Sequence, residues 1–211
     1  MPHRLLIYFV LMWVILYRLP RFIPTPPLVD RCCNQMRTGD LLLYSGRSLD
    51  SALIRAWTGG TFTHIGMVWI DPATQDRYCW NSDKRSSVPC ILRQECCDGP
   101  QLQLLSAKLE AASGCMYHVP WNERRYRRPQ LTRAYMNQVG GGFRDSVVVM
   151  AVAALPELVP NVATGPSRDL LCTELVAKTI FELAGYYVVR RTRPDTFLAL
   201  PLVRRDLISL V

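Results

Sequence analysis

Histidine is scarce in this sequence, and two kinds of regular pattern are absent from it. Only three histidines occur, so few side chains can act as a general base near neutral pH. No stretch repeats, which excludes solenoid and propeller architectures. The eight cysteines follow no zinc-ligand spacing. The sequence therefore predicts no metal site, and we expect no organic cofactor either.

The composition is that of a folded domain with an appendage. Apolar residues make up 49% of the 211 positions, which is too many for a disordered chain. This length accommodates one domain with a sizeable core. The formal charge of +8 favours contact with anionic surfaces or acidic substrates.

An uninterrupted apolar run occupies residues 5–17, between Arg4 and Arg18. As a helix it would reach about 20 Å, which is short of the roughly 30 Å hydrocarbon core of a bilayer. A secretory signal has an apolar stretch of this length, but no Ala-x-Ala-like cleavage site follows. We therefore expect residues 1–20 to form an uncleaved single-pass membrane anchor, with a signal segment or a buried core helix as the alternatives. Arginine on both sides leaves the orientation open.

A proline-rich and therefore stiff linker over residues 21–35 separates this segment from the domain predicted for residues 36–211. Within the domain, apolar alternation predicts strands and helical periodicity predicts helices. The expected strands cover residues 41–44, 61–70, 77–82, 101–105, 115–119 and 186–190. The expected helices cover residues 48–57, 130–138, 146–155 and 172–184, and residues 84–100 are expected to be mostly loop. This mixture predicts an α+β domain with strands in the middle and helices packed at one side.

Cys172 is the strongest candidate for a nucleophile. Apolar residues follow it at helical spacing up to Gly185, a typical C-cap, while Ser167 and Asp169 offer N-cap oxygens upstream. Cys172 therefore falls in or near the first helical turn, where unpaired N–H groups and the helix dipole stabilise a thiolate. The competing interpretation is a buried cysteine that only fills space on the inner face of the helix.

His64 is the candidate general base. His3 belongs to the N-terminal segment, and His118 lies in a short stretch that ends at a proline. One face of the predicted His64 strand carries four residues, Phe62, His64, Gly66 and Val68. Both faces are largely apolar, which indicates a central strand with His64 partly buried. A hydrogen-bonded core histidine is the alternative.

A catalytic imidazole needs an acceptor that orients its second nitrogen. A turn over residues 71–76 makes residues 77–82 the hairpin partner of the His64 strand. Asn81 lies near the end of that partner, close to where a neighbour of His64 is expected. Asp83 is the alternative and the stronger acceptor, and a simple surface-turn role is open for both.

Four segments, taken in order, resemble the circularly permuted papain-like branch of the NlpC superfamily. That branch includes YiiX-like bacterial proteins, poxviral papain-like proteins and, more distantly, lecithin:retinol acyltransferases. Thr38-Gly-Asp-Leu-Leu-Leu-Tyr44 is similar to the first strand of that branch, and Thr63-His-Ile-Gly-Met-Val68 is similar to its histidine strand. Leu171-Cys-Thr-Glu-Leu-Val-Ala-Lys178 is similar to its nucleophile helix, and Arg193-Pro-Asp-Thr-Phe-Leu198 is similar to its closing segment. The resemblance spans residues 36–203.

The resemblance implies a permuted papain-like (NlpC-type) fold with an antiparallel sheet packed on helices. It implies that Cys172 is the nucleophile and that His64 is the general base and acid. The family's third polar residue falls on Asn81, where many relatives have glutamate or a second histidine. Asparagine departs from that pattern, although an asparagine orients the imidazole in Cys-His-Asn sites.

The predicted function is therefore that of a membrane-associated cysteine hydrolase or acyltransferase. It would act on an amide or ester carbonyl of a peptide or acyl substrate through an acyl-thioester on Cys172. The alternative is a catalytically inactive papain-like scaffold or interaction protein, which the asparagine at position 81 suggests. The oligomeric state is not predicted.

Two arginine clusters bear on the partners. The first surrounds Tyr126, and the second follows the nucleophile helix; their members are Arg124, Arg125, Arg127, Arg128, Arg190, Arg191 and Arg193. These clusters suit anionic membrane lipid or an acidic substrate, although a solvated loop is the favoured interpretation of the first. One aromatic among the arginines predicts no nucleic-acid binding. A thiol nucleophile also favours reducing surroundings with mostly free cysteines.

Overall fold

The computed structural model describes residues 35–84, 86–139, 171–188, 193–203 and 208–210. The expected anchor at residues 1–20, nearly all of the linker and the helix expected over residues 146–155 lie outside these ranges. None of the helices within the ranges is both long and apolar enough to cross a membrane.

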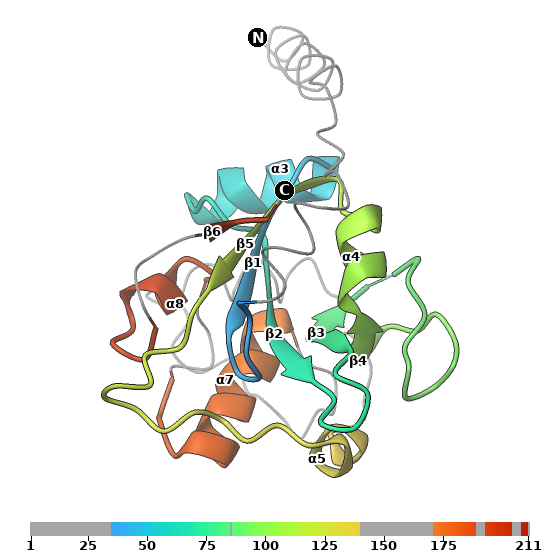
Figure 1. Cartoon of the computed structure of the whole chain (residues 1–211). Helices are drawn as coiled ribbons and strands as arrows, with labels where there is room; N and C mark the ends of the chain where they lie inside the picture. Colours follow the sequence, from blue (N-terminus) through green and yellow to red (C-terminus); the bar gives the residue numbers. More distant parts are fainter. Residues whose placement is uncertain (1–34, 85, 140–170, 189–192, 204–207, 211) are drawn as a thin grey trace, which may run out of the picture.

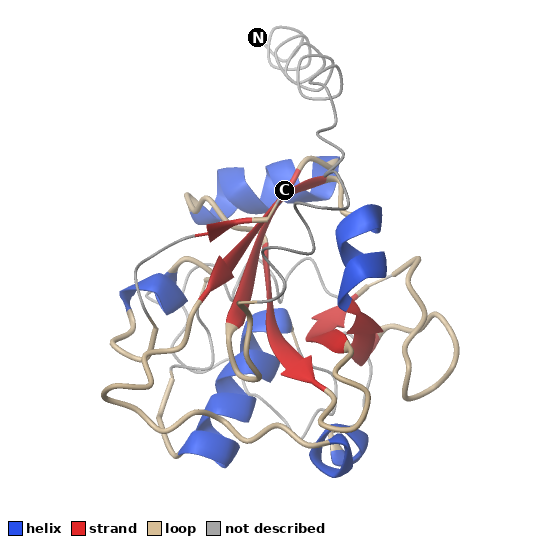
Figure 2. Cartoon of the chain, viewed as in Figure 1, coloured by secondary structure: helices blue, strands red, loops and turns tan. Residues whose placement is uncertain are grey.

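One antiparallel sheet organises the domain, with helices around it (Figures 1 and 2). Its six strands run in the order β4-β3-β2-β1-β5-β6. Their bounds are β1 Leu41–Gly46, β2 His64–Ile70, β3 Arg77–Asp83, β4 Gly99–Leu104, β5 Gly114–Val119 and β6 Ile208–Ser209. The helices are α3 Leu49–Thr58, α4 Leu105–Ala111, α5 Arg133–Gln138, α7 Cys172–Ala184 and α8 Thr196–Ala199. The α+β class predicted from the sequence is confirmed.

The central strand β2 contributes to an apolar layer on each side of the sheet. Its residues Ile65 and Met67 belong to the cluster that includes Val176 and Ile180 of α7. Val68 instead packs with the cluster of α4 on the opposite face. Alternate burial of this kind follows from the two-residue period of a strand. The sheet is therefore covered by α7 on one face and by α4 on the other.

One detail of the predicted strand pattern is wrong. Phe62 packs with the α7 cluster, whereas Val68 packs with the α4 cluster, so the two do not share a face. The reason is that β2 begins at His64, and the strand alternation does not extend back to Phe62.

Local signals in the sequence account for most element boundaries. Ser48 caps α3, since its hydroxyl accepts the N–H of Ser51 at 3.1 Å, and Gly59 ends the helix with φ of 62°. In the turn before β3, the N–H of Gln75 donates to the carbonyl of Asp71 at 2.8 Å. These features confirm the predicted helix and hairpin.

One expected strand is absent where the structure describes it, and three short elements, α4, α8 and β6, were not expected. Residues 186–188 of the strand expected over 186–190 are not in a strand; they follow the left-handed turn at Gly185 that ends α7 without pairing to the sheet. The short helix α4 was not expected. It exists because Leu105 and Leu109, one helical turn apart, are both buried on the sheet.

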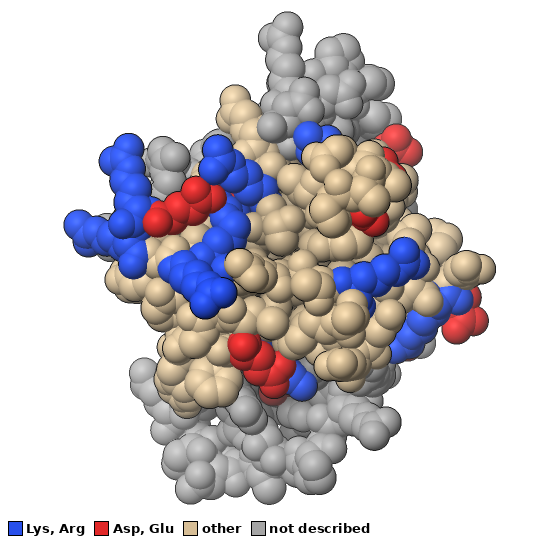
Figure 3. Space-filling view, turned by 60° about the horizontal axis from the view of Figure 1, so that its bottom comes forward, with Lys and Arg blue, Asp and Glu red and all other residues tan. Residues whose placement is uncertain are grey.

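Basic side chains are prominent on one face of the molecule. Figure 3 shows lysine and arginine side chains in a larger group at the left of this face and a smaller group at its right. The acidic side chains on this face are fewer and lie among the basic ones or apart from them.

A substitution at Gly66 tests the packing that places β2 beside β3. A Cβ at this position would lie 2.7 Å from the sulfur of Cys79 and 3.3 Å from the Cβ of Asn81. We expect Gly66→Ala to lower the free energy of unfolding by about 1–3 kcal/mol, measured by denaturant titration. Gly66→Ala combined with Cys79→Ala should regain part of this loss, with Cys79→Ala alone as the control. Equal stability of Gly66→Ala and the native chain would contradict the observed packing.

Candidate active site

Helix α7 begins at Cys172 because the residue before it is held in an extended conformation. Leu171 has φ of −71° and ψ of 160°, and its N–H donates to the carboxylate of Glu174 at 3.0 Å. The first helical hydrogen bond runs from the N–H of Leu175 to the carbonyl of Leu171 at 2.9 Å. The predicted start of the helix at Cys172 and its end at Gly185, with φ of 74°, are both confirmed. The proposed caps Ser167 and Asp169 lie outside the described residues.

The sulfur of Cys172 lies against the backbone of β2. Burial raises the pKa of Cys172 to about 11, and the hydrogen bond from the backbone N–H of Ile65 is the largest effect that opposes this rise. The negative charge of Asp83 raises the pKa further, while the N–H groups of Thr173 and of Cys172 itself lower it. The thiol is therefore protonated at neutral pH in the resting protein, despite its position at a helix N-terminus.

The pairing of β2 with β3 explains why the backbone N–H of Ile65 is available to the sulfur of Cys172. Pairing of the two strands runs from Ile70 opposite Arg77 to Gly66 opposite Asn81. Ile65 is the next residue beyond the last pair. The first turn of α7 thus meets the sheet where β2 and β3 part, directly beside His64.

His64 is the first residue of β2 and is half-buried. It pairs with Tyr44 of β1, and the two rings pack edge to face with their centroids 5.1 Å apart. Burial lowers the pKa of His64 to about 4; the charge of Asp83 opposes this change and the charge of Lys108 adds to it. The imidazole is therefore neutral at pH 7. Its Nε2 atom is buried and has no hydrogen-bond partner within the described part of the chain.

Asp83, at the end of β3, is the acidic group that acts on His64. Continuing the register of the two strands would place Asp83 opposite His64. Burial acts to raise the pKa of Asp83, but the charges of His64 and Lys108 outweigh it and leave this pKa lowered. Lys108 of α4 also forms an ion pair with the Asp83 carboxylate. The carboxylate thus pairs directly with Lys108, while its charge also acts on the imidazole of His64.

Asn81 is fully buried two residues before Asp83. Its Nδ2 donates to the sulfur of Cys79 at 3.2 Å and to the Oε1 of Gln103 at 3.1 Å. Its Oδ1 has no partner among the residues that the structure describes. The structure records no hydrogen bond from Asn81 to His64, so the orienting role of Asn81 stays a prediction.

Cys172 and His64 belong to opposite sides of the sheet, and the sulfur of Cys172 contacts the backbone of Ile65, the residue after His64. Helix α7 covers one face, whereas His64 packs on Tyr44, which belongs to the cluster on the other face. No hydrogen bond joins the two side chains within the described ranges. They nevertheless share neighbours: Asp83 acts on both, and the pKa of Tyr44 is raised by burial and also by the charge on Cys172.

Asp195, in the closing segment of the chain, binds the backbone of the residues just before His64. The carboxylate of Asp195, just before α8, accepts the N–H of Thr61 at 2.8 Å and the N–H of Phe62 at 3.2 Å. Two hydrogen bonds to a charged acceptor fix the backbone directly upstream of β2. Asp195 was part of the closing motif, but the sequence alone did not show what it binds. Lys108 was missed because α4 was missed.

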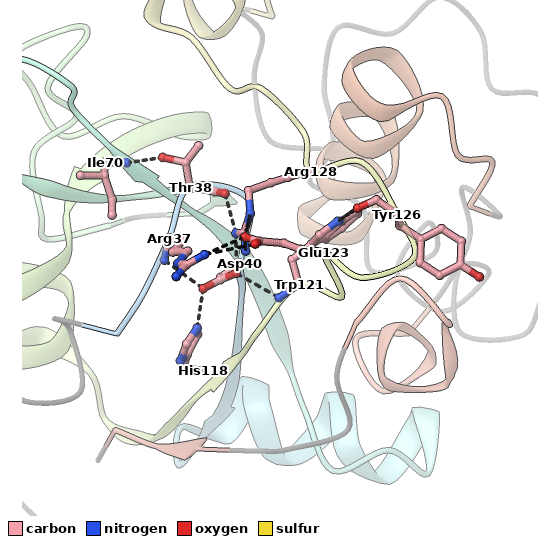
Figure 4. A network of polar contacts seen from close by, with 9 residues as sticks. All are labelled: Arg37, Thr38, Asp40, Ile70, His118, Trp121, Glu123, Tyr126 and Arg128. Atoms are coloured by element: carbon pink, nitrogen blue, oxygen red, sulfur yellow. Dashed lines mark hydrogen bonds and ion pairs between the residues drawn. The ribbon is translucent and has the colours of Figure 1, made fainter.

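His118 is occupied elsewhere in the fold. Its Nε2 lies 2.7 Å from the Oδ2 of Asp40, in the polar network of Figure 4. The Oδ1 of Asp40 accepts the N–H of Trp121 at 3.0 Å and pairs with Arg128 at 2.6 Å. These contacts give His118 a structural role. Within the described ranges, no group of three or more His, Cys, Asp or Glu side chains is arranged to hold a metal ion.

Comparisons with known proteins give a weak structural similarity. No family model and no curated protein sequence matches the chain. The crystal structure of the metalloprotein YiiX from Escherichia coli O157:H7 is similar with a TM-score of 0.41 and 17% sequence identity. The match covers 73% of this chain and 69% of that chain.

The pH dependence of thiol alkylation tests the resting state of Cys172. With a pKa of about 11, the thiolate fraction should rise about tenfold per pH unit from neutral pH upward. Iodoacetamide labelling of the tryptic peptide spanning residues 169–178, in which Cys172 is the only cysteine, measures this directly. A rate that is already at its plateau near pH 7 would instead reveal a preformed thiolate–imidazolium pair.

Removal of the Lys108 charge tests the electrostatics at His64. We expect Lys108→Met to raise the pKa of His64 from about 4 toward its ordinary value of 6.5, since the Asp83 charge then acts on the imidazole alone. An NMR titration of the His64 ring protons gives the value. Lys178→Met, on α7, is the charge-matched control. An unchanged His64 pKa in Lys108→Met would show that Lys108 does not act on this histidine.

Proposed function

We propose that this protein is a cysteine hydrolase or acyltransferase of the permuted papain-like type, with Cys172 as nucleophile and His64 as general base and acid. The observation that carries the proposal is the position of the Cys172 sulfur against the backbone N–H of Ile65, next to His64. A helix N-terminus, a thiol and a neutral imidazole then converge on one end of the sheet.

The reaction would begin from a neutral pair, because the thiol is protonated and the imidazole is unprotonated at pH 7. His64 Nε2 accepts the thiol proton as the sulfur bonds to the carbonyl carbon of an amide or ester. The protonated imidazole returns the proton to the leaving nitrogen or oxygen as its bond to carbon breaks. Water or an acceptor then releases the acyl group from Cys172 by the reverse sequence.

Asp83 would stabilise the imidazolium that forms in each half-reaction. We assign it this role in preference to Asn81, because its charge acts on His64 whereas the amide of Asn81 binds Cys79 and Gln103. The backbone N–H of Cys172 has no helical partner at the first position of α7, so it would serve as an oxyanion donor.

We also propose that the protein acts at a membrane, with residues 1–20 as its anchor. The apolar run between Arg4 and Arg18 supports this location. Acyl groups of membrane lipids or peptide amides near the bilayer would then be the substrates within reach.

Acylation by an activated ester tests the proposed pair. With p-nitrophenyl acetate, we expect acetylation of residues 169–178 to be faster than acetylation of the peptide that carries Cys96 and Cys97, which are internal controls. His64→Ala should slow acetylation of Cys172 by about 100- to 10,000-fold, because general-base assistance is lost. Quantitative mass spectrometry of the tryptic peptides measures both rates.

The same assay compares the two candidates for the third group. We expect Asp83→Asn to slow acetylation of Cys172 more than Asn81→Ala does. The opposite order would return the orienting role to Asn81. If Cys172 reacts no faster than the control cysteines and His64→Ala has no effect, the inactive-scaffold alternative holds.

A further inference from the structure

We infer that the loop of residues 121–128 is a binding surface for anionic membrane lipid. We call it the arginine loop. It presents three guanidinium groups to solvent on a backbone that is fixed to the rest of the domain. The inference shares the membrane location of the proposed function but is independent of Cys172 chemistry.

The charges of the loop are only partly balanced within the protein. Glu123 accepts hydrogen bonds from Arg37 at 3.1 Å and from Arg128 at 2.8 Å. Arg128 also pairs with buried Asp40. The pKa of Glu123 is lowered, chiefly by its hydrogen bond with Arg128, so its negative charge persists.

The other three arginines of the loop have no acidic partner among the described residues. Arg124, Arg125 and Arg127 are all exposed, and none has a side-chain hydrogen bond or ion pair within the described part of the chain. The larger group of basic side chains in Figure 3 lies at the left of the view, the side on which the chain leaves β5 in Figure 1. Three positive charges within four residues, without acidic partners, produce a locally positive surface.

The backbone of the loop is held at both ends and in the middle. The N–H of Asn122 donates to the carbonyl of Leu202 at 2.8 Å, and the indole N–H of Trp121 donates to the carbonyl of Tyr126 at 3.2 Å. The rings of Tyr126 and Tyr186 pack edge to face, 5.1 Å apart, and the Tyr186 hydroxyl accepts the N–H of Arg127 at 3.2 Å. Figure 4 shows Trp121 and Tyr126 joined within the polar network that includes Arg128.

This anchoring sets the direction of the side chains and lowers the cost of binding. A loop that is already ordered loses little conformational freedom when it meets a charged surface. The inward position of Tyr126 leaves the flanking arginines exposed to solvent. The loop is therefore more than the freely solvated segment that its composition favours.

Lipid headgroups suit this surface better than nucleic acid does. Single-stranded nucleic acid is bound by exposed aromatic rings among basic groups, but Trp121 of the loop is buried and Tyr126 packs on Tyr186. The apolar run at residues 5–17 also has arginine at both of its ends. An anionic bilayer offers many phosphates and carboxylates at once, which matches a row of arginines without a shaped pocket.

Vesicle flotation of the full chain tests the inference. The probes are vesicles of phosphatidylcholine alone and vesicles containing phosphatidylserine. The variant is Arg124→Gln, Arg125→Gln and Arg127→Gln combined. Each arginine near an anionic surface contributes about fivefold to partitioning, so we expect the triple variant to lose about 100-fold on phosphatidylserine vesicles. Binding to phosphatidylcholine alone, which reports the N-terminal apolar run, should not change.

A charge-matched control carries Arg93→Gln, Arg133→Gln and Lys178→Gln, three substitutions away from the arginine loop. It should keep its binding to phosphatidylserine vesicles. Acetylation of Cys172 in free solution should be unchanged in both triple variants; in the control, which lacks the cleavage site at Lys178, it is measured on the tryptic peptide of residues 169–190, in which Cys172 is also the only cysteine. Acetylation in His64→Ala therefore tests the proposed function, and lipid binding in the loop variant tests the present inference, independently of each other.

Three results would overturn the inference. The first is equal loss of lipid binding in the loop variant and the control, which would mean that only net charge matters. The second is displacement of the protein from the vesicles by inorganic phosphate at the concentration of the lipid headgroups, which would mean that single phosphates are bound. The third is an unchanged affinity for phosphatidylserine together with lost binding of a short single-stranded RNA.

Discussion

The contact between the first residue of α7 and the end of β2 is the constraint on which the candidate site depends. The N–H of Ile65, one residue beyond the ladder with β3, is directed to the sulfur of Cys172. This contact exists because the helix packs along one face of the sheet and starts where two strands part. Without the contact between Cys172 and Ile65, nothing would bring Cys172, on one face of the sheet, near His64, on the other.

Burial then sets the chemistry of the two groups. It raises the pKa of Cys172 and lowers that of His64, so each is neutral in the resting protein. A neutral pair can transfer a proton only as the nucleophile attacks, and the ions that form need nearby charge to stabilise them. In the proposed reaction Asp83 would supply that charge for the imidazolium, and Lys108 would limit its effect, because it pairs with the same carboxylate. The balance between these two groups is therefore expected to tune the reactivity of the thiol.

Much of the fold could be predicted from the sequence, because its signals are local. Capping by Ser48, the left-handed glycines and strand alternation identify α3, α7 and the hairpin of β2 and β3. The position of α7 against the sheet could not be predicted, since it depends on contacts between residues far apart in the chain. For the same reason, the bonds from Asp195 to the backbone before His64 became visible only in the folded structure.

The third polar group shows most clearly where prediction from sequence ends. Family resemblance indicated Asn81 and chemistry allowed Asp83, and the strand register and the electrostatics support the proposal of Asp83. Asn81 pairs with Gly66 of β2, and the Asn81 side chain donates hydrogen bonds to Cys79 and Gln103. Asp83, two residues farther along the same strand, is the acidic residue whose charge acts on His64.

The most direct test of the account is a crystal structure of the protein with Cys172 acetylated. The account predicts that His64 Nε2 lies within about 3–4 Å of the thioester sulfur or of the water that attacks it, with Asp83 beside the imidazole. An imidazole that stays packed on Tyr44 with Nε2 directed away from the acetyl group, and no space for it to turn, would contradict the account.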